Sequence, residues 1–334
     1  MVSEVREVKI LVTGGAGFIG RWVVKRLLEL SGASQGGDMP FVKFLRDCEV
    51  WVLDDLSNGS ENNLEDLRHQ DAFKELVEGE VRDQGLVRKL FLYRFDLCIH
   101  LAAQINVQES LNDPVKAFST NVVGTYHILE EAREYNTKVV LVGTCMVYDL
   151  ANAATAISEA HRLKPASPYA GSKLAAEHLA ESYYHGYGLP VVICRPFNTY
   201  GPFQKSDMEG GVVSIFIKRN LGGKMLEVFG GGTQTRDLLY VEDCADFLLR
   251  ASFHEVAVGQ VLNAGTGKDV SINKLALLIC RDEKRIAHVP HHHPQSEIAK
   301  LTCDYSKARL LLGWEPKVGL EEGIKKTEEW LRVQ

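Results

Sequence analysis

The chain has 334 residues, of which 45% are hydrophobic and 25% are charged, as in ordinary globular proteins. Its net charge of −6 and the lack of a lysine or arginine cluster argue against a nucleic-acid partner, because phosphate binding needs a basic face. No apolar run reaches the roughly 18 residues of a membrane span, and residues 1–7 lack the apolar core of a signal peptide. We therefore expect a cytoplasmic protein that binds small molecules and contacts no membrane.

The N-terminal half alternates apolar runs with helical patterns. Strands are predicted at 8–12, 49–53, 96–100, 139–142 and 191–194, and helices at 18–30, 114–135 and 169–187. This repetition predicts an α/β fold with a doubly wound, parallel Rossmann sheet. From residue 198 glycine clusters interrupt the pattern, before a strand at 260–263 and helices at 271–281 and 304–312. We expect a smaller, partly interleaved C-terminal domain there.

A glycine-rich turn follows the first predicted strand. Gly14, Gly17 and Gly20 have the spacing GxxGxxG and open a predicted helix, which is the setting of a pyrophosphate-binding turn. The second strand ends at Asp54, whose carboxylate accepts hydrogen bonds from a ribose 2′-hydroxyl and repels a 2′-phosphate. The pattern therefore favours NAD over NADP.

Tyr169 and Lys173 lie four residues apart on a predicted helix, so that the phenol and the ammonium share one face. The cation favours the phenolate and brings the tyrosine towards the role of a general base near neutral pH. Thr144 follows a predicted strand, at the edge where α/β folds bind ligands. We expect Tyr169 to take a hydroxyl proton and Thr144 to bond the same oxygen.

Further motifs complete a pattern that resembles the extended short-chain dehydrogenase/reductase family of nucleotide-sugar epimerases and dehydratases. They are Val81-Arg82-Asp83, His100-Leu101-Ala102-Ala103-Gln104, Asn121-Val122-Val123-Gly124-Thr125 and Arg195-Pro196-Phe197-Asn198-Thr199-Tyr200-Gly201-Pro202. The resemblance runs from residue 8 to about residue 330. It implies a tightly held NAD, a nucleoside-diphosphate sugar that is UDP-linked, and a homodimer formed through the helices at 114–135 and 169–187.

The resemblance also implies a division of the chain. Residues 1–197 and about 236–266 form the NAD-binding Rossmann domain, and residues 198–235 and 267–334 bind the nucleotide sugar. Lys173 bonds the nicotinamide ribose besides tuning Tyr169. The remaining cofactor-binding residues that it implies are Gly14, Gly17, Phe18, Ile19, Gly20, Asp54, Asn58, Val81, Asp83, Leu101, Ala102, Ala103, Gln104 and Asn121.

Five residues are expected to bind the substrate. They are Met146, Asn198, Phe229, Arg236 and Glu297. A guanidinium fork suits phosphate oxygens, so Arg236 is expected to hold the diphosphate unless it pairs with Asp237 or Asp243. Glu297 matches an acidic position that bonds the nucleotide ribose in the family, although the arginine that often precedes it is absent here.

Neither the histidines nor the cysteines suggest a metal. His291, His292 and His293 point to alternate sides of an extended segment and have no partner at ligand spacing, so we expect one to contact the substrate. The seven cysteines form no Cys-x-x-Cys pair, and several lie in apolar runs. They are expected to be reduced and buried.

Positions 145 and 146 indicate which reaction follows the oxidation. In the family's 4,6-dehydratases the residues after the threonine resemble Asp-Glu, and these carboxyl groups eliminate water. Here they are Cys145 and Met146. A thioether moves no proton, and an ordinary thiol is a poor substitute for a carboxylic acid. An NAD-dependent nucleotide-sugar 4-epimerase, which needs neither carboxyl group, is therefore expected.

Two alternatives remain. Cys145 can serve as an unconventional acid if its surroundings tune its pKa, which would make the protein a 4,6-dehydratase. A non-catalytic protein that binds NAD or a nucleotide sugar is also compatible with the fold, although it would not require Thr144, Tyr169 and Lys173 together. Pocket shape decides the sugar, and the sequence does not fix that shape.

Overall fold

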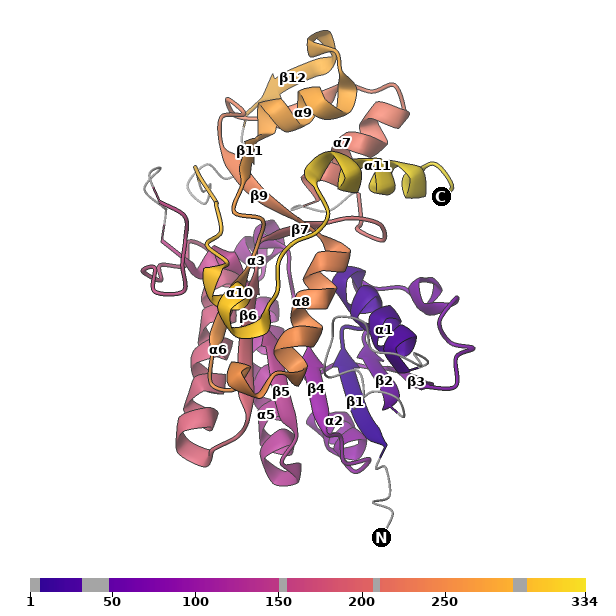
Figure 1. The fold of residues 1–334 in the computed structure, drawn as a ribbon, viewed down its shortest axis with the longest axis vertical. Helices are drawn as coiled ribbons and strands as arrows, with labels where there is room; N and C mark the ends of the chain where they lie inside the picture. Colours follow the sequence, from indigo (N-terminus) through magenta and orange to yellow (C-terminus); the bar gives the residue numbers. More distant parts are fainter. Residues whose placement is uncertain (1–6, 32–47, 150–154, 207–210, 291–298) are drawn as a thin grey trace.

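A computed structural model describes residues 7–31, 48–149, 155–206, 211–290 and 299–334. Its centre is a seven-stranded sheet in which every neighbouring pair of strands is parallel, in the order β10-β6-β5-β4-β1-β2-β3 (Figure 1). The strands are β1 (Val8–Thr13), β2 (Cys48–Asp54), β3 (Phe73–Glu78), β4 (Leu97–His100), β5 (Lys138–Val142), β6 (Val191–Pro196) and β10 (Val261–Ala264). The predicted parallel α/β sheet is confirmed.

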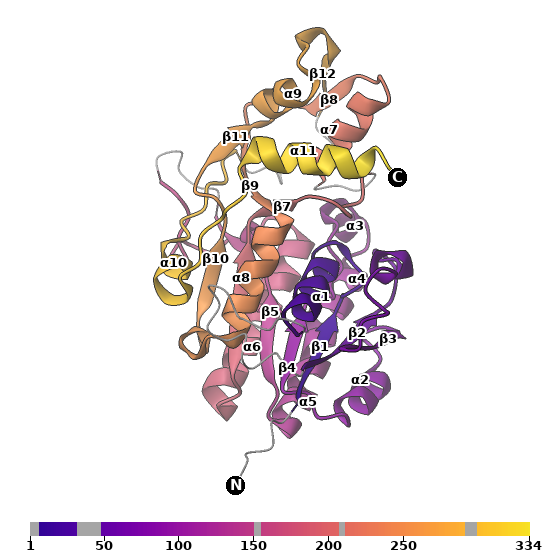
Figure 2. The ribbon, with the colours of Figure 1, turned by 45° about the vertical axis from the view of Figure 1, so that its right-hand side comes forward.

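The sheet is buried on both faces because its strands send alternate apolar side chains to opposite sides. In β1, Ile10 and Val12 join one core cluster, whereas Leu11 joins the other. Helices α1 (Phe18–Ser31) and α8 (Val241–Phe253) cover the first face, and the two lie side by side in Figures 1 and 2. Helices α2 (Gln84–Phe91), α5 (Gly124–Tyr135) and α6 (Pro168–Tyr187) cover the second.

Two small sheets and three helices gather at the carboxyl end of the large sheet, in the upper part of Figure 1. One sheet has the order β11-β9-β7 and the other pairs β12 with β8. A separate apolar cluster holds this part together, with Phe216 and Tyr240 among its buried members. The elements are β7 (Asn198–Tyr200), α7 (Val212–Leu221), β8 (Leu226–Phe229), β9 (Thr235–Tyr240), β11 (Asp269–Ser271), α9 (Ile272–Cys280), β12 (Ile286–Val289) and α11 (Leu320–Leu331).

The helix predicted at 114–135 is interrupted. It consists of α4 (Pro114–Phe118), a π-helical turn (Ser119–Val123) and α5. A short helix α3 (Val107–Asn112) precedes it, and the Asp113 side chain caps α4 by accepting the Lys116 N–H at 3.2 Å. π-Helical turns are frequent at functional sites. Helix α10 (Ser306–Leu312) packs against β10, which is an edge strand of the large sheet.

The cysteines have the surroundings expected of them. All seven lie in described residues, none of them forms a disulfide, and Cys280 alone among them is partly exposed. Within the ranges that the structure describes, no helix combines the length and the apolarity needed to cross a bilayer.

Candidate active site

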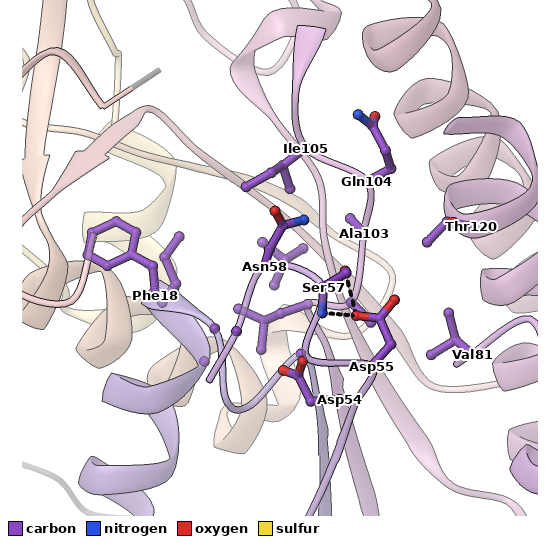
Figure 3. Close-up of a pocket in the computed structure, with 18 of the residues that line it drawn as sticks. Phe18, Asp54, Asp55, Ser57, Asn58, Val81, Ala103, Gln104, Ile105 and Thr120 are labelled. Carbon is purple, nitrogen blue, oxygen red and sulfur yellow. Dashed lines mark hydrogen bonds between the residues drawn. The ribbon is translucent and has the colours of Figure 1, made fainter. Parts of the chain in front are cut away.

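A pocket opens at the carboxyl ends of the parallel strands, where open α/β sheets bind ligands. Its volume of about 470 Å³ lies within the range of roughly 300–1,000 Å³ that is usual for small-molecule sites. The predicted residues that line it are Gly14, Gly17, Phe18, Ile19, Gly20, Asp54, Asn58, Val81, Leu101, Ala102, Ala103, Gln104, Thr144, Tyr169 and Lys173. Figure 3 shows part of this lining.

The glycine turn packs too closely for side chains. Gly14 has a positive φ of 72°, and a Cβ there would lie 2.8 Å from the backbone nitrogen of Ala102. A Cβ on Gly20 would overlap with the carbonyl oxygen of Gly14. Gly17 donates its N–H to the same oxygen at 3.2 Å. The turn therefore brings bare backbone to the pocket at the start of α1, as a pyrophosphate-binding turn requires.

Two adjacent carboxylates follow β2 at the pocket wall. Asp54 accepts the Ala16 N–H and the Leu56 N–H, each at 2.9 Å, and burial raises its pKa. Asp55 accepts from the backbone nitrogen and the hydroxyl of Ser57, at 3.0 and 2.6 Å (Figure 3). Asp55 also lines the pocket, although it was not among the residues predicted from the motifs. The two carboxyl groups thus stand side by side at this part of the pocket wall.

Asn121 and Asp83 lie outside the pocket lining. Asn121 is buried behind the wall, where it accepts the Gln104 N–H at 2.8 Å and donates to the Gln104 carbonyl at 3.0 Å. The same amide donates to the Ser172 hydroxyl at 2.9 Å, and so ties the π-helical turn to α6. Asp83 caps α2 by accepting the Leu86 N–H at 3.0 Å. Their direct contact with a cofactor stays a prediction.

A buried histidine holds the wall at the end of β4. Thr125 Oγ1 donates to the Asn121 carbonyl at 2.6 Å and therefore accepts from His100 Nε2, 3.1 Å away. His100 Nδ1 then accepts from Thr13 Oγ1 at 2.6 Å, and Thr13 Oγ1 accepts the Ala102 N–H at 3.2 Å. Burial lowers the pKa of His100 to about 3, so the ring is neutral. This chain fixes Ala102 beside Gly14.

Thr144, Tyr169 and Lys173 meet at the pocket. Ser167 caps α6 by accepting the Ala170 N–H at 3.2 Å, and the hydroxyl of Thr144 bonds the Tyr169 phenol. Lys173 donates to the Val142 carbonyl at 2.6 Å. These positions agree with the predicted spacing.

The protonation of the pair differs from the expectation. Burial raises the pKa of Tyr169 to about 12 and lowers that of Lys173 to about 8. The bond from Thr144 lowers the Tyr169 pKa, but burial outweighs it. In the protein alone the tyrosine is a neutral phenol near pH 7, so the lysine by itself does not create a phenolate.

Cys145 and Met146 form no part of the pocket lining. Cys145 is buried among Val147, Phe197 and Cys303, and burial raises the pKa of its thiol to about 12. Met146 is partly buried against the same cluster, and its N–H donates to Thr144 Oγ1 at 3.2 Å. The two side chains therefore belong to the packing below the pocket wall.

Three of the expected substrate-binding residues, Asn198, Phe229 and Arg236, lie on strands of the small sheets and outside the pocket lining. Asn198 is on β7, and its side-chain oxygen is buried with no hydrogen-bond partner in the described part of the chain. Arg236, on β9, donates to the Thr235 carbonyl at 2.9 Å, and its positive charge acts to lower the pKa of the Cys145 thiol, although burial outweighs this effect. Phe229 ends β8 and is 36% exposed. Glu297 and His291–His293 lie outside the described residues.

The two aspartates considered as partners of Arg236 have structural hydrogen bonds of their own. Asp237 accepts from the backbone nitrogens of Thr266, Gly267 and Cys303, at 2.7, 2.9 and 3.0 Å. Asp243 accepts from backbone nitrogens of residues 317 and 318. Both carboxylates thus fix loops of the small-sheet region.

Several residues of the pocket wall were not predicted from the sequence. Ile105 directly follows the motif that ends at Gln104, and Phe203 and Lys205 follow Gly201-Pro202. Their closeness to matched motifs was the available signal. Lys116 and Thr120 come from the broken helix and gave no signal, because only the fold brings α4 to the wall.

Comparisons with known proteins agree with this geometry. The model of the family described as GDP-mannose 4,6 dehydratase matches residues 11–327. The chain belongs to this family. The family comprises NAD-dependent nucleotide-sugar epimerases and dehydratases of the extended short-chain dehydrogenase/reductase type. The resemblance seen in the motifs is therefore confirmed.

Three relatives span nearly the whole chain. A putative UDP-glucose 4-epimerase of Methanocaldococcus jannaschii is 35% identical over 97% of this chain and 98% of its own. The X-ray structure of Pal from Bacillus thuringiensis is 53% identical, with a TM-score of 0.90 and coverage of 98% and 99%. A UDP-glucose 4-epimerase from Thermus thermophilus, in complex with NAD, is 31% identical, with a TM-score of 0.85 and coverage of 97% and 99%. Epimerases and dehydratases of nucleotide sugars both occur in this family.

Proposed function

We propose that the protein is an NAD-dependent nucleotide-sugar 4-epimerase that acts on a UDP-linked hexose or a derivative of one. The observation that carries this proposal is the contrast between Thr144, Tyr169 and Lys173, which line the pocket, and the pair Cys145 and Met146, which do not. The first set suits the oxidation of an alcohol. The second lacks the carboxyl groups that elimination needs.

The pocket fits NAD. The glycine turn leaves room for a pyrophosphate, since side chains on Gly14 or Gly20 would collide with backbone. Asp54 and Asp55 suit a ribose with free hydroxyl groups and disfavour a 2′-phosphate. When bound, NAD supplies a hydride acceptor for C4 of the sugar and returns the hydride afterwards. The positive charge of its nicotinamide ring favours the phenolate of Tyr169 as well.

The chain's own residues move the proton. Tyr169 takes the proton of the C4 hydroxyl as the hydride leaves C4, and gives it back when the hydride returns. Thr144 donates a hydrogen bond towards the phenol oxygen and orients it. Lys173 holds a positive charge beside the reaction, in a buried place where it is weakly screened. If the sugar turns over in the site, a hydride returned by bound NAD would reach the opposite face of C4.

Dehydration requires an acid and a base next to C5 and C6, and Cys145 suits neither role. A thiol with a pKa of about 12 is a weak acid, and its thiolate is negligible near pH 7. The guanidinium of Arg236 is proposed to bind the diphosphate, and the buried oxygen of Asn198 is proposed to accept a hydrogen bond from a hydroxyl of the sugar. These assignments place the nucleotide sugar against the small sheets, and the cofactor against the large one.

We also propose a homodimer whose interface is formed by helices α3, α4, α5 and α6. Apolar side chains exposed there are Leu111, Val115, Phe118, Tyr126 and Tyr187. A second copy of the chain would cover them, since large exposed apolar patches mark interaction sites. Sedimentation of the protein and of Phe118→Glu tests this: the variant should be monomeric, and a monomeric parent would contradict the proposal.

Tyr169→Phe tests the catalytic assignment. The substitution removes one hydroxyl group and keeps the ring, so turnover should fall by at least about 10²-fold, the usual contribution of a general base. The variant should still bind NAD, which fluorescence or mass spectrometry of the purified protein measures. Unchanged turnover would exclude Tyr169 as the base. If neither the parent protein nor Tyr169→Phe converts any nucleotide sugar, the protein binds its ligands without catalysis.

A further inference from the structure

A buried ion pair lies directly behind the Thr144, Tyr169 and Lys173 set. Glu177 follows Lys173 by one turn of α6 and is 1% exposed, and Arg195 on β6 is 4% exposed. The Nη2 and Nε atoms of Arg195 donate to the same oxygen of Glu177, Oε2, at 2.6 and 3.0 Å. The third nitrogen of the guanidinium, Nη1, donates to the Tyr148 hydroxyl at 2.9 Å. None of these three side chains belongs to the reaction described above.

The other carboxylate oxygen of Glu177 lies against the backbone of the pocket wall. Oε1 is buried and has no hydrogen-bond partner in the part of the chain that the structure describes. It lies against Gly143, because a Cβ on Gly143 would overlap with it. The carbonyl of the preceding residue, Val142, accepts the ammonium of Lys173 at 2.6 Å. The ammonium and the unpaired oxygen therefore meet at one peptide group, Val142–Gly143, which lines the pocket.

We propose that Glu177 is a positioning residue of the active site, whose carboxylate keeps Lys173 charged and in place while Arg195 keeps that carboxylate ionised. The inference rests on the proposed function only in so far as Lys173 serves the reaction. Lys173, Glu177 and Arg195 then form a row of alternating charges that runs from the pocket into the core. The carboxylate also explains why residue 143 is a glycine, because a Cβ there would overlap with Glu177 Oε1.

Electrostatics make such a partner necessary. Burial lowers the pKa of Lys173 to about 8, and the charge of Glu177 opposes this change. Burial raises the pKa of Glu177, and the Arg195 charge and hydrogen bonds oppose that change in turn. Lys173 interacts electrostatically with Glu177 on α6 and with His100 on β4, and Tyr169 precedes it by one turn of α6. Cys145, after β5, interacts with Tyr169, and Arg195, on β6, interacts with Glu177. His100 is neutral, and both Tyr169 and Cys145 are protonated near pH 7.

The direction in which the titration midpoint of Lys173 moves when Glu177 is replaced distinguishes this role from simple packing. Without the carboxylate, Lys173 loses the charge that opposes the effect of burial on its pKa, so its titration midpoint should fall by about one pH unit or more, as expected when an opposite charge is lost nearby. If Glu177 merely fills space, its replacement admits water, and the midpoint should rise towards the usual value of about 10.4.

The experiment follows the side-chain resonance of Lys173 by NMR in protein labelled with ¹³C-lysine, assigned through its disappearance in Lys173→Met. Glu177→Gln should lower the midpoint relative to the parent protein. The matched control Glu177→Asp also disturbs packing but retains the charge, so its midpoint should stay close to that of the parent. Equal shifts in the two variants, or an unchanged or raised midpoint in Glu177→Gln, would overturn the proposal.

A second measurement covers the case in which Glu177→Gln does not fold. In the parent protein labelled with ¹³C-glutamate, the carboxyl resonance of Glu177 should report an ionised group at pH 7, and a protonated group would overturn the proposal. Neither titration needs a substrate, so a failure of the epimerase assignment leaves both readable. With an active enzyme, the alkaline limb of the kcat/KM profile should move to lower pH in Glu177→Gln, in step with the NMR midpoint.

Discussion

Burial sets the chemistry of single residues at this site, and it acts in opposite directions on an acid and on a cation. It keeps Tyr169 a phenol, with a pKa of about 12, and brings the pKa of Lys173 down to about 8. Both groups are thus protonated near pH 7 in the protein alone. Additional positive charge, such as a bound nicotinamide would bring, favours the phenolate, and we propose that Tyr169 becomes a base only in that complex.

Cys145→Ala tests the choice between epimerisation and dehydration at the level of one residue. Since the thiol is buried outside the pocket lining, turnover should change by less than about tenfold, which corresponds to about 1.4 kcal/mol of activation free energy. Initial rates with the accepted nucleotide sugar measure this change. Loss of all product, with the fold retained by circular dichroism, would make Cys145 a catalytic acid and would support the dehydratase.

Among the elements, the turn between β1 and α1 has the strictest requirement for glycine. Gly20→Ala would bring a Cβ onto the carbonyl oxygen of Gly14, so the backbone must shift. We expect a loss of about 1–3 kcal/mol in the free energy of unfolding and weaker NAD binding. Urea denaturation and cofactor titration measure the two effects.

The control for Gly20→Ala is Gly186→Ala in α6. An added Cβ at Gly186 has no neighbour within 4 Å, and alanine stabilises an exposed helical position by roughly 0.5–1 kcal/mol relative to glycine. The two identical substitutions should therefore change stability in opposite directions. Equal effects would contradict the packing that we describe for the turn.

Strands that are buried on both faces were predictable from the sequence, because nearly all of their side chains are apolar. β1, β2, β4, β5 and β6 are apolar runs because helices cover both faces of the sheet. β3 was missed, since it is an edge strand in which exposed charged residues such as Lys74 and Glu75 interrupt the apolar pattern. α8 was missed as well, and the predicted helix at 114–135 hid the π-helical turn, which local patterns do not reveal.

The candidate site was predictable where motifs carry it. The positions of Thr144, Tyr169 and Lys173 at one pocket follow from strand ends and helical spacing. Their protonation did not, because it depends on burial and on contacts such as the bond from Lys173 to the Val142 carbonyl. Residues brought in from afar, such as Lys116, also require the fold.

At the scale of the whole molecule, an aromatic cluster joins three distant segments. Trp22 of α1 donates to the Pro202 carbonyl at 3.1 Å, and its ring lies 6.2 Å from that of Phe203. Phe203 lies 5.1 Å from Trp330 of α11, and the guanidinium of Arg21 stands 3.8 Å from the Phe203 ring centre. The cluster thus connects α1, which follows the glycine turn, with α11 beside the small sheets, and its central residue Phe203 lines the pocket.

Trp330→Ala should therefore weaken the whole fold as well as the end of the chain. Loss of the half-buried indole is expected to lower the free energy of unfolding by about 1–3 kcal/mol. Val333→Ala, at a residue that is 79% exposed, should change it by less than about 0.5 kcal/mol. Urea denaturation followed by fluorescence compares the two. A Trp330→Ala variant as stable as Val333→Ala would show that the cluster contributes little.

The most direct test of the epimerase assignment follows the fate of the sugar itself. UDP-glucose, UDP-N-acetylglucosamine and UDP-glucuronate are each incubated with the protein in D₂O, and proton NMR records the anomeric and ring signals. We predict that one of them is converted to its C4 epimer, with the original hydrogen still on C4 and no deuterium at C5 or C6. A 4-keto-6-deoxy product, recognised by its methyl signal and by deuterium from the solvent, would contradict the account.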